Sequence, residues 1–354
     1  MRSPLIFFGI LNLVLVFGCG EDPVTKPEPK KPNVFWAPIG LSGEVFMQLL
    51  YHEGNLYVAA ARDGAFVQNP AFFGKWVKLE RGFPEFYQGG TLPGPGPYAI
   101  TFHENVLHAG VWEPSSYNLP GIYHWSDVDS TWVPSPNPLS DAEVYSLASS
   151  GNRNLVASTG QRGVQVSEDN GVSWRLTSGS EGSLNPWLLF FNEPRGLYAA
   201  GSTALFYPVL KKSTDHGLTW EELTWKLPGG DGRISSLAES PNAPYPLYIF
   251  FQTNAYVAVR DTSSFVPILE TSGSGTILLN PLDPMEVWVG SDSLYRSPDG
   301  GISWRGYNLP QGGSRLGEAT VDWERRLMAI VVWDAGGQGT IHCVNLDAAP
   351  DSIP

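Results

Sequence analysis

The sequence has few charged residues, only two cysteines and no excess of positive charge. Charged residues make up 16% of its 354 residues, and the formal net charge is −13. A nucleic-acid-binding protein needs a basic surface for the phosphates, so this balance argues against such a partner. After the N-terminal region, no stretch carries apolar residues sustained at helical spacing, which argues against a helical fold.

Residues that form turns and strands are abundant instead. The chain contains 39 Gly, 30 Pro and 13 Trp, a composition that favours short strands and tight loops. A chain of 354 residues can hold one large all-β domain or two domains of ordinary size.

The first 18 residues have the features of an export signal. Arg2 precedes an apolar run over 5–17 that is too short to cross a bilayer and has the length of a signal-peptide core. The string VFGC at 16–19 resembles the bacterial lipobox, in which the cysteine receives a lipid and becomes the new N-terminus. We therefore expect a signal peptide over 1–18 and membrane attachment through a lipid on Cys19. The alternative is an ordinary signal peptide and a soluble exported protein.

Residues 19–33 are expected to be the lipidated cysteine and a flexible tether. The string GEDPVTKPEPKKPN alternates Pro, Glu and Lys and offers nothing apolar to bury. Because Gly20 follows the cysteine where an inner-membrane retention signal has Asp, we expect the outer membrane if the host is Gram-negative. Cys343, in the apolar string TIHCVNL, is expected to be a buried free thiol.

The strongest signal in the rest of the chain is an internal repeat. Three segments match S-x-D-x-G-x-x-W without a gap: SEDNGVSW from Ser167, STDHGLTW from Ser213 and SPDGGISW from Ser297. The second and third are nearly twice as far apart as the first two, so one copy is missing between them. Degenerate copies end at Trp76 and at Trp132 in SDVDSTW, and Phe265 follows RDTSS where the missing copy is expected.

The repeated residues have a structural chemistry. The Ser and Asp side chains can hydrogen-bond turn backbone groups, and the Gly can adopt positive φ. The Trp begins the next strand and can bury its ring between neighbouring sheets. The expected structural residues are Ser167, Asp169, Gly171, Trp174, Ser213, Asp215, Gly217, Trp220, Ser297, Asp299, Gly301 and Trp304. A calcium site is disfavoured because each copy supplies one carboxylate, and we expect no metal and no cofactor.

A recurring apolar strand sets the number of units. It begins near Leu56, Val106, Leu155, Leu197, Leu247, Glu286 and Leu327. Four short strands per unit predict an all-β fold, a single β-propeller of seven four-stranded blades over 34–347, followed by a tail over 348–354. The last unit lacks a fourth strand and the string NVFWAPI at 33–39 lacks a sheet, so we predict that this N-terminal strand closes the ring.

On these motifs the chain resembles the Asp-box, or bacterial neuraminidase repeat, superfamily. That group includes sialidases, sortilin-like ectodomains and the photosystem II assembly-factor propellers. The resemblance implies that the repeats lie on one face and that the opposite face binds the ligand. The ligand-face residues it implies are Arg62, Asp63, Phe86, Tyr87, Trp112, Glu113, Arg162, Arg233, Asp292, Trp333 and Asp334. Aromatic and charged side chains together suit a sugar or a peptide segment; the alternative is ordinary polar loop tips around the axis of the ring.

Enzymatic activity is not favoured by the sequence. The Arg-Ile-Pro motif of sialidases is absent, and the nearest string, RGFP from Arg81, does not match it. Another glycosidase would need two carboxylates across the sugar; Asp63, Glu113, Asp292 and Asp334 are the candidates, but nothing in the sequence pairs them. We expect a monomeric, membrane-anchored, non-catalytic propeller that binds a protein or glycan at the cell envelope. A carbohydrate-active hydrolase is the alternative.

Overall fold

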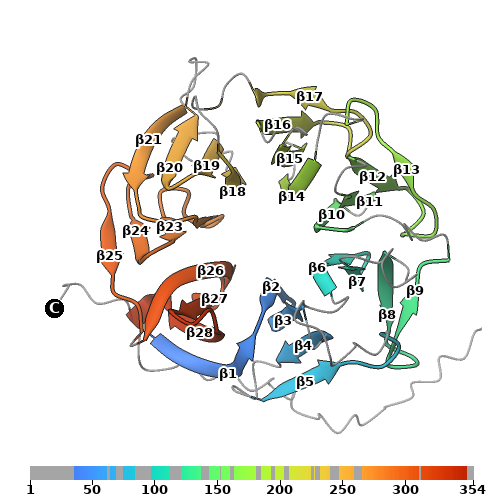
Figure 1. The fold of residues 1–354 in the computed structure, drawn as a ribbon, viewed down its shortest axis with the longest axis horizontal. Helices are drawn as coiled ribbons and strands as arrows, with labels where there is room; N and C mark the ends of the chain where they lie inside the picture. Colours follow the sequence, from blue (N-terminus) through green and yellow to red (C-terminus); the bar gives the residue numbers. More distant parts are fainter. Residues whose placement is uncertain are drawn as a thin grey trace, which may run out of the picture.

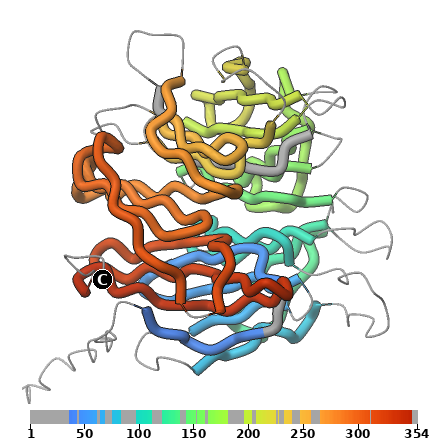
Figure 2. Tube along the Cα trace, turned by 60° about the vertical axis from the view of Figure 1, so that its left-hand side comes forward, coloured from blue at the N-terminus to red at the C-terminus, as the bar shows by residue number. Residues whose placement is uncertain are grey.

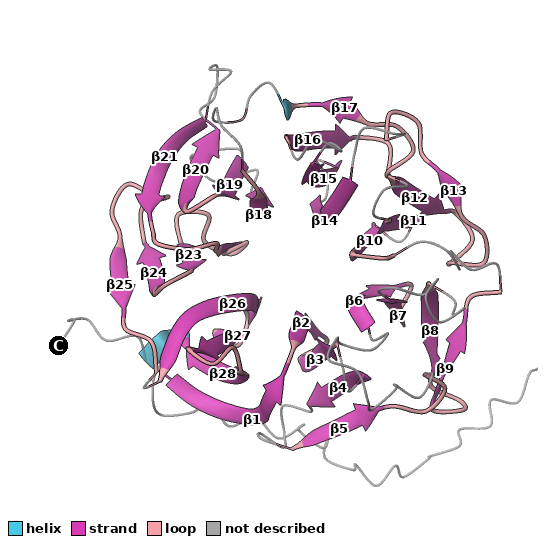
Figure 3. Cartoon of the chain, in the orientation of Figure 1, coloured by secondary structure: helices cyan, strands magenta, loops and turns pink. Residues whose placement is uncertain are grey.

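The protein forms a ring of seven β-sheets (Figure 1). The computed structural model describes residues 36–61, 64–68, 75–83, 97–111, 121–136, 143–151, 153–159, 163–180, 185–192, 196–202, 207–224, 227, 232–239, 247–258, 265–310 and 312–348. No α-helix occurs among these residues, and a short 3-10 turn, Leu346–Ala348, follows the last strand (Figure 3).

Each sheet has four antiparallel strands, so the predicted seven-bladed β-propeller is confirmed. The innermost strands of blades 1 to 7 are β2 Phe46–His52, β6 Pro97–His103, β10 Ser146–Ser150, β14 Asn185–Asn192, β18 Ile234–Glu239, β22 Thr276–Leu279 and β26 Gly313–Asp322. The second strands are β3 Asn55–Ala60, β7 Val106–Val111, β11 Asn154–Ser158, β15 Gly196–Ser202, β19 Leu247–Phe251, β23 Val287–Gly290 and β27 Leu327–Asp334. The third strands are β4 Gly64–Gln68, β8 Ile122–Ser126, β12 Val164–Ser167, β16 Pro208–Ser213, β20 Asn254–Ala258, β24 Leu294–Ser297 and β28 Gly339–Asn345. The fourth, at the rim, are β5 Trp76–Leu79, β9 Thr131–Pro134, β13 Arg175–Leu176, β17 Glu221–Glu222, β21 Phe265–Glu270, β25 Arg305–Tyr307 and β1 Trp36–Glu44.

The N-terminal strand completes the last blade, as predicted. β1 pairs antiparallel with β28, with Trp36 opposite Val344 and Ala37 opposite Cys343. The N-terminal strand therefore lies beside the C-terminal strands (Figure 2). This pairing covers the edge of β28 and holds the two ends of the ring together. Cys343 is a fully buried free thiol, and burial raises its pKa to about 12.

The core is divided among the interfaces between blades. The described residues form seven apolar clusters, and each joins residues of two neighbouring blades. The second strands are buried on both faces, so β11, β19 and β23 lack exposed positions. This explains why these strands read as continuous apolar strings with the predicted starts, without an alternating pattern.

Tryptophans at the rim connect one blade to the next. Nε1 of Trp36, Trp76 and Trp132 donates to the carbonyl oxygens of Asn308, Ile39 and Leu79, at 3.1, 2.8 and 2.8 Å. Nε1 of Trp220 donates to Thr177 Oγ1 at 2.9 Å. In each case the acceptor lies at the rim of the preceding blade. These hydrogen bonds therefore connect the outermost strands of neighbouring blades.

The repeat tryptophans are buried to different extents, although Trp174 and Trp304 also pack against apolar clusters between blades. All three stand at the start of the fourth strand, but only Trp220 is buried, at 9% exposure. Trp174 and Trp304 are half-buried and donate to Gly171 O and Gly301 O of their own turns, both at 3.1 Å.

Candidate functional site

In each sheet the second strand ends and the third begins on the same face of the ring as the start of the innermost strand, and this face is here called the loop face. Four of the predicted ligand-face residues belong to the described part of the chain: Arg233, Asp292, Trp333 and Asp334. Arg62, Asp63, Phe86, Tyr87, Trp112, Glu113 and Arg162 lie outside the described residues.

Asp292 forms a polar link between blades 5 and 6. Its Oδ2 accepts hydrogen bonds from Ser272 Oγ at 2.7 Å and from the Ser272 N–H at 3.2 Å, and its Oδ1 accepts one from the Tyr295 hydroxyl at 2.9 Å. Partial burial opposes ionisation, but the bonds from Ser272 and Tyr295 outweigh it and lower the pKa of Asp292. A carboxylate held ionised in this way suits a structural role better than that of a general acid.

Trp333 and Asp334 stand where β27 ends on the loop face. The Arg315 guanidinium lies 5.6 Å from the Trp333 ring centre, a cation–π distance. Asp334 Oδ1 accepts the Gln338 N–H at 2.8 Å. Trp333 therefore keeps a partly exposed ring with a positive charge beside it.

A second group of residues lies on or beside the innermost strands, and of these the sequence analysis named only Arg233. We call Tyr98, Arg233 and Glu318 the axial cluster. Tyr98 belongs to β6 of blade 2, Arg233 directly precedes β18 of blade 5, and Glu318 belongs to β26 of blade 7. The charges of Arg233 and Glu318 both act on the Tyr98 hydroxyl. These three blades are not neighbours in the ring, and their innermost strands surround its centre (Figure 1).

Bulges in the innermost strands turn side chains away from the regular sheet. The pairing of β6 with β7 shifts between Pro97 and Ala99, at Tyr98, and the pairing of β26 with β27 shifts between Leu316 and Ala319. A bulge adds a residue to one strand and re-aims its side chain. Such shifts follow from strand register, so the sequence offered no local signal for Tyr98 or Glu318.

Tyr145 extends the axial cluster toward blade 3. Its ring meets the Tyr98 ring edge-on, with centroids 5.7 Å apart, and its hydroxyl donates to Glu143. The loop face thus carries aromatic rings next to groups of both charges, an arrangement that can bind a polar ligand with an apolar side.

The opposite face, here called the turn face, carries the repeat turns. In each, the Ser hydroxyl oxygen accepts the Gly N–H at 2.7 to 2.8 Å and donates to the Asp at 2.7 to 2.8 Å. The Asp also accepts the N–H and hydroxyl of Ser173, Thr219 or Ser303. The sequence analysis did not assign a role to this Ser or Thr, which directly precedes the Trp of each repeat. Both carboxylate oxygens of each Asp therefore accept hydrogen bonds from the Asp's own turn.

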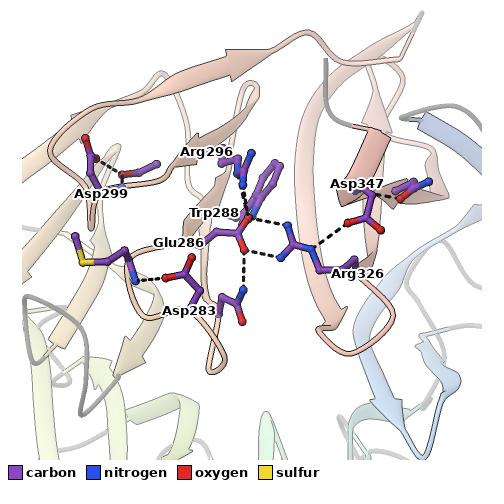
Figure 4. A network of polar contacts seen from close by, with 11 residues as sticks. Asp283, Glu286, Trp288, Arg296, Asp299, Arg326 and Asp347 are labelled. Atoms are coloured by element: carbon purple, nitrogen blue, oxygen red, sulfur yellow. Dashed lines mark hydrogen bonds and ion pairs between the residues drawn. The ribbon is translucent and has the colours of Figure 1, made fainter. Parts of the chain in front are cut away.

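A buried ion network on the turn face joins blades 6 and 7 (Figure 4). The Glu286 side chain is 3% exposed. It accepts from Arg326 Nη1 at 2.5 Å and Nη2 at 3.0 Å, from Arg296 Nε at 3.0 Å and from Asn280 Nδ2 at 2.7 Å. Burial opposes ionisation, yet the bonds from Arg326 and Asn280 lower the pKa of Glu286 to about 2. The network is a structural connection between the two blades.

Neither a metal site nor a membrane-spanning helix is found among the described residues. No group of three or more His, Cys, Asp and Glu side chains there could hold a metal ion. Within the same residues, no helix has the length and apolar character needed to cross a membrane.

The fold is similar to that of known propellers. No family model matches the chain, and no curated protein matches its sequence. Among solved structures, YCF48 bound to D1 peptide aligns with a TM-score of 0.65 and 15% identity, covering 89% of this chain and 98% of that one. YCF48 from Cyanidioschyzon merolae aligns with a TM-score of 0.65 and 13% identity, covering 89% and 100%. The extracellular domain of BT4673 from B. thetaiotaomicron, described as a one component system, gives 0.60 and 12%, covering 87% and 40%. At these identities the likeness establishes the seven-bladed propeller fold alone.

Proposed function

We propose that this chain is an exported, lipid-anchored, non-catalytic propeller that binds a protein partner through its loop face at the cell envelope. The observation that carries the proposal is the contact between the Tyr98 and Tyr145 rings of blades 2 and 3, with the charge of Arg233 near enough to act on Tyr98. A structure similar in fold was solved as YCF48 bound to D1 peptide, which favours a peptide segment of a protein over a glycan as the ligand.

The position of the chain ends is compatible with an anchor that leaves the loop face free. Trp36 pairs with Val344, and the N–H of Leu346 donates to Arg326 O in the turn between β26 and β27. Both ends of the described chain therefore lie toward the turn face. A tether from a lipidated Cys19 would direct the loop face away from the membrane. We also propose that the repeat turns are Asp-boxes.

Capture of partners by the membrane-anchored protein tests the binding proposal. The Tyr98→Ala/Arg233→Ala variant should lose a partner that the native chain retains, because both side chains border the axis. Ile302→Ala is the matched control, since Ile302 is 73% exposed in a repeat turn on the other face. Equal capture by all three proteins would refute the assigned face. Turnover of a chromogenic glycoside would instead support a hydrolase.

Fractionation tests the anchor separately. Cys19→Ala should move the protein out of the membrane fraction, because the substitution removes the thiol that receives the lipid. Unchanged membrane retention would refute lipid anchoring without affecting the loop-face proposal.

A further inference from the structure

Exposed apolar side chains concentrate on the turn face. Val128 lies in the turn between β8 and β9 and is 94% exposed, and Ile302, in the repeat turn of blade 6, is 73% exposed. Single exposed apolar residues are ordinary, but several on one face mark an interaction surface. Among the described residues, the exposed apolar side chains of the turn face, here called the turn-face tips, are Val106, Val128, Val172, Leu282, Met285 and Ile302.

The turn-face tips stand on opposite sides of the ring. The first three belong to blades 2 and 3 and the last three to blade 6. Blade 6 lies across the ring from blades 2 and 3 (Figure 1). Within blade 6, the Gly300 N–H donates to Met285 O at 2.8 Å, so two adjoining turns supply its tips. An occupant that reaches both sides of the ring at once must be broad and flat.

The turns hold the tips in place and use the carboxylates beside them. Asp129 Oδ2 accepts the Ser126 hydroxyl at 3.2 Å, and the Asp129 N–H donates to Ser126 Oγ at 3.3 Å. Asp283 Oδ1 accepts the Met285 N–H at 3.1 Å. Because these carboxylates surround the tips and the net charge of the chain is −13, an anionic occupant is disfavoured. The tips therefore suit a surface without net charge.

The described chain also enters the ring on the turn face. Trp36, its first residue, pairs with Val344 near the end of β28. The expected tether over 19–33 precedes Trp36, and a segment of that length spans at most about 50 Å when fully extended. A lipid on Cys19 would therefore keep the turn face, and not the loop face, close to the membrane.

We propose that the turn face rests on a lipid bilayer and that the turn-face tips insert between the headgroups of a zwitterionic surface. This inference rests on the proposed function, and it adds a second, non-covalent membrane contact to the lipid. A bilayer is broad and flat enough to meet tips on both sides of the ring, and each aliphatic side chain that leaves water strengthens the contact. A modest affinity is sufficient, because the lipid already holds the protein at the surface.

The first test measures flotation of the full chain carrying Cys19→Ala, which cannot receive the lipid, with phosphatidylcholine vesicles. Val128→Asp/Ile302→Asp in this chain should weaken vesicle binding at least about tenfold, because two aliphatic side chains no longer leave water. Val77→Asp/Val266→Asp is the matched control, since it makes the same charge change at exposed positions of the rim, and it should bind as the parent chain does. Thermal unfolding checks that both double variants keep the fold.

The second test places a fluorescent label on the lipoprotein in vesicles. A label on Ile302→Cys should be quenched by brominated acyl chains and shielded from iodide in the water. A label on Thr253→Cys, an exposed residue of the loop face between β19 and β20, should show the opposite. Cys343 is buried and does not compete for the label.

Equal vesicle binding by the two double variants, or equal quenching at both faces, would overturn the inference. Tighter binding when phosphatidylglycerol replaces part of the phosphatidylcholine would overturn it by assigning the contact to headgroup charge. A dimer that Val128→Asp/Ile302→Asp dissociates, without any response to vesicles, would assign the tips to a second copy of the chain. If the tips bind vesicles but mass spectrometry finds no lipid on Cys19, only the anchor of the proposed function fails; if the lipid is present and the tips do not bind, only this inference fails.

Discussion

At the scale of single residues, Glu286 shows how a buried charge is retained. Arg296 and Arg326 bring two positive charges to a carboxylate whose side chain is 3% exposed. Such an arrangement recovers the cost of desolvation only while all partners remain. Blades 6 and 7 are therefore joined by an interaction that tolerates no loss of a partner.

Glu286→Gln should lower the free energy of unfolding by about 1–3 kcal/mol, because the partly exposed Arg296 loses its counter-charge and Arg326 keeps only that of Asp347. Denaturant unfolding measures this change. Glu168→Gln is the control: Glu168 pairs with Arg175 at 2.8 Å, but both side chains are more than half exposed, and its loss should cost less than about 1 kcal/mol. Equal losses would contradict the structural role of Glu286.

The buried His108 side chain leads us to expect that acid lowers the stability of the folded protein. It is 3% exposed, its Nε2 has no hydrogen-bond partner, and burial together with His124 and His103 lowers its pKa to about 3. The pKa of His108 is lower in the folded state than the unfolded value of 6.5. Above pH 6.5 the imidazole is neutral in both states, so His108 does not reduce the stability. As the pH falls from 6.5 toward 3, the unfolded state binds a proton that the folded state does not, and the free energy of unfolding decreases. At pH 5 the loss from this residue should be about 2 kcal/mol.

Urea midpoints at pH 7 and pH 5 measure this effect. His108→Gln, which stays neutral, should show a smaller drop between the two pH values than the native chain. An identical drop would assign the acid sensitivity to other groups.

At the scale of elements, the fourth strands depend on their first aromatic residue. Three of these strands begin with an aromatic residue: Trp36, Trp76 or Phe265. Trp132 is the second residue of its strand, and Trp174, Trp220 and Trp304 directly precede theirs. Some of these tryptophans donate a hydrogen bond from Nε1 to the preceding blade and so connect two blades. Others donate to a carbonyl of their own turn and make no hydrogen bond between blades through Nε1.

Trp132→Phe should therefore destabilise the protein more than Trp304→Phe. Trp132 is 2% exposed, and its loss leaves the Leu79 carbonyl without its donor, at a cost of about 1–3 kcal/mol. Trp304 is half-buried and bonds a carbonyl of its own turn. Thermal unfolding of the two variants compares them, and a larger effect of Trp304→Phe would contradict the interface role.

At the scale of the whole molecule, stability depends on closing the ring. Among the described residues, each apolar cluster lies between two neighbouring blades and none belongs to a single blade. β1 supplies Ile39 to the cluster between blades 7 and 1, so an N-terminal strand decides whether the first and last blades stay together.

Ile39→Asp should open this interface, because Ile39 is 2% exposed and burying an unpaired carboxylate is strongly unfavourable. Hydrogen exchange should then show lost protection in β1 and β28. Val77→Asp is the control on another fourth strand, where the residue is 61% exposed and protection should be kept. Retained protection in Ile39→Asp would contradict closure by β1.

The sequence by itself determined the number of blades, the starts of the second strands and the closure by an N-terminal strand. Those features arise from local chemistry: Ser, Asp and Gly define a turn through bonds within eight residues, and buried strands need unbroken apolar strings. It also pointed to the Asp-containing turns, but it missed Ser173, Thr219 and Ser303, which lie next to the motif tryptophans.

Only the tertiary structure decided which charged side chains act on Tyr98 and which tryptophans cross between blades. Tyr98, Arg233 and Glu318 come from blades far apart in the chain, and two of them depend on bulges that change strand register without a local sequence signal. Trp36 lies at the rim of the ring because β1 forms the outermost strand of the last blade. Such placements depend on how seven sheets pack around one axis, which no single segment encodes.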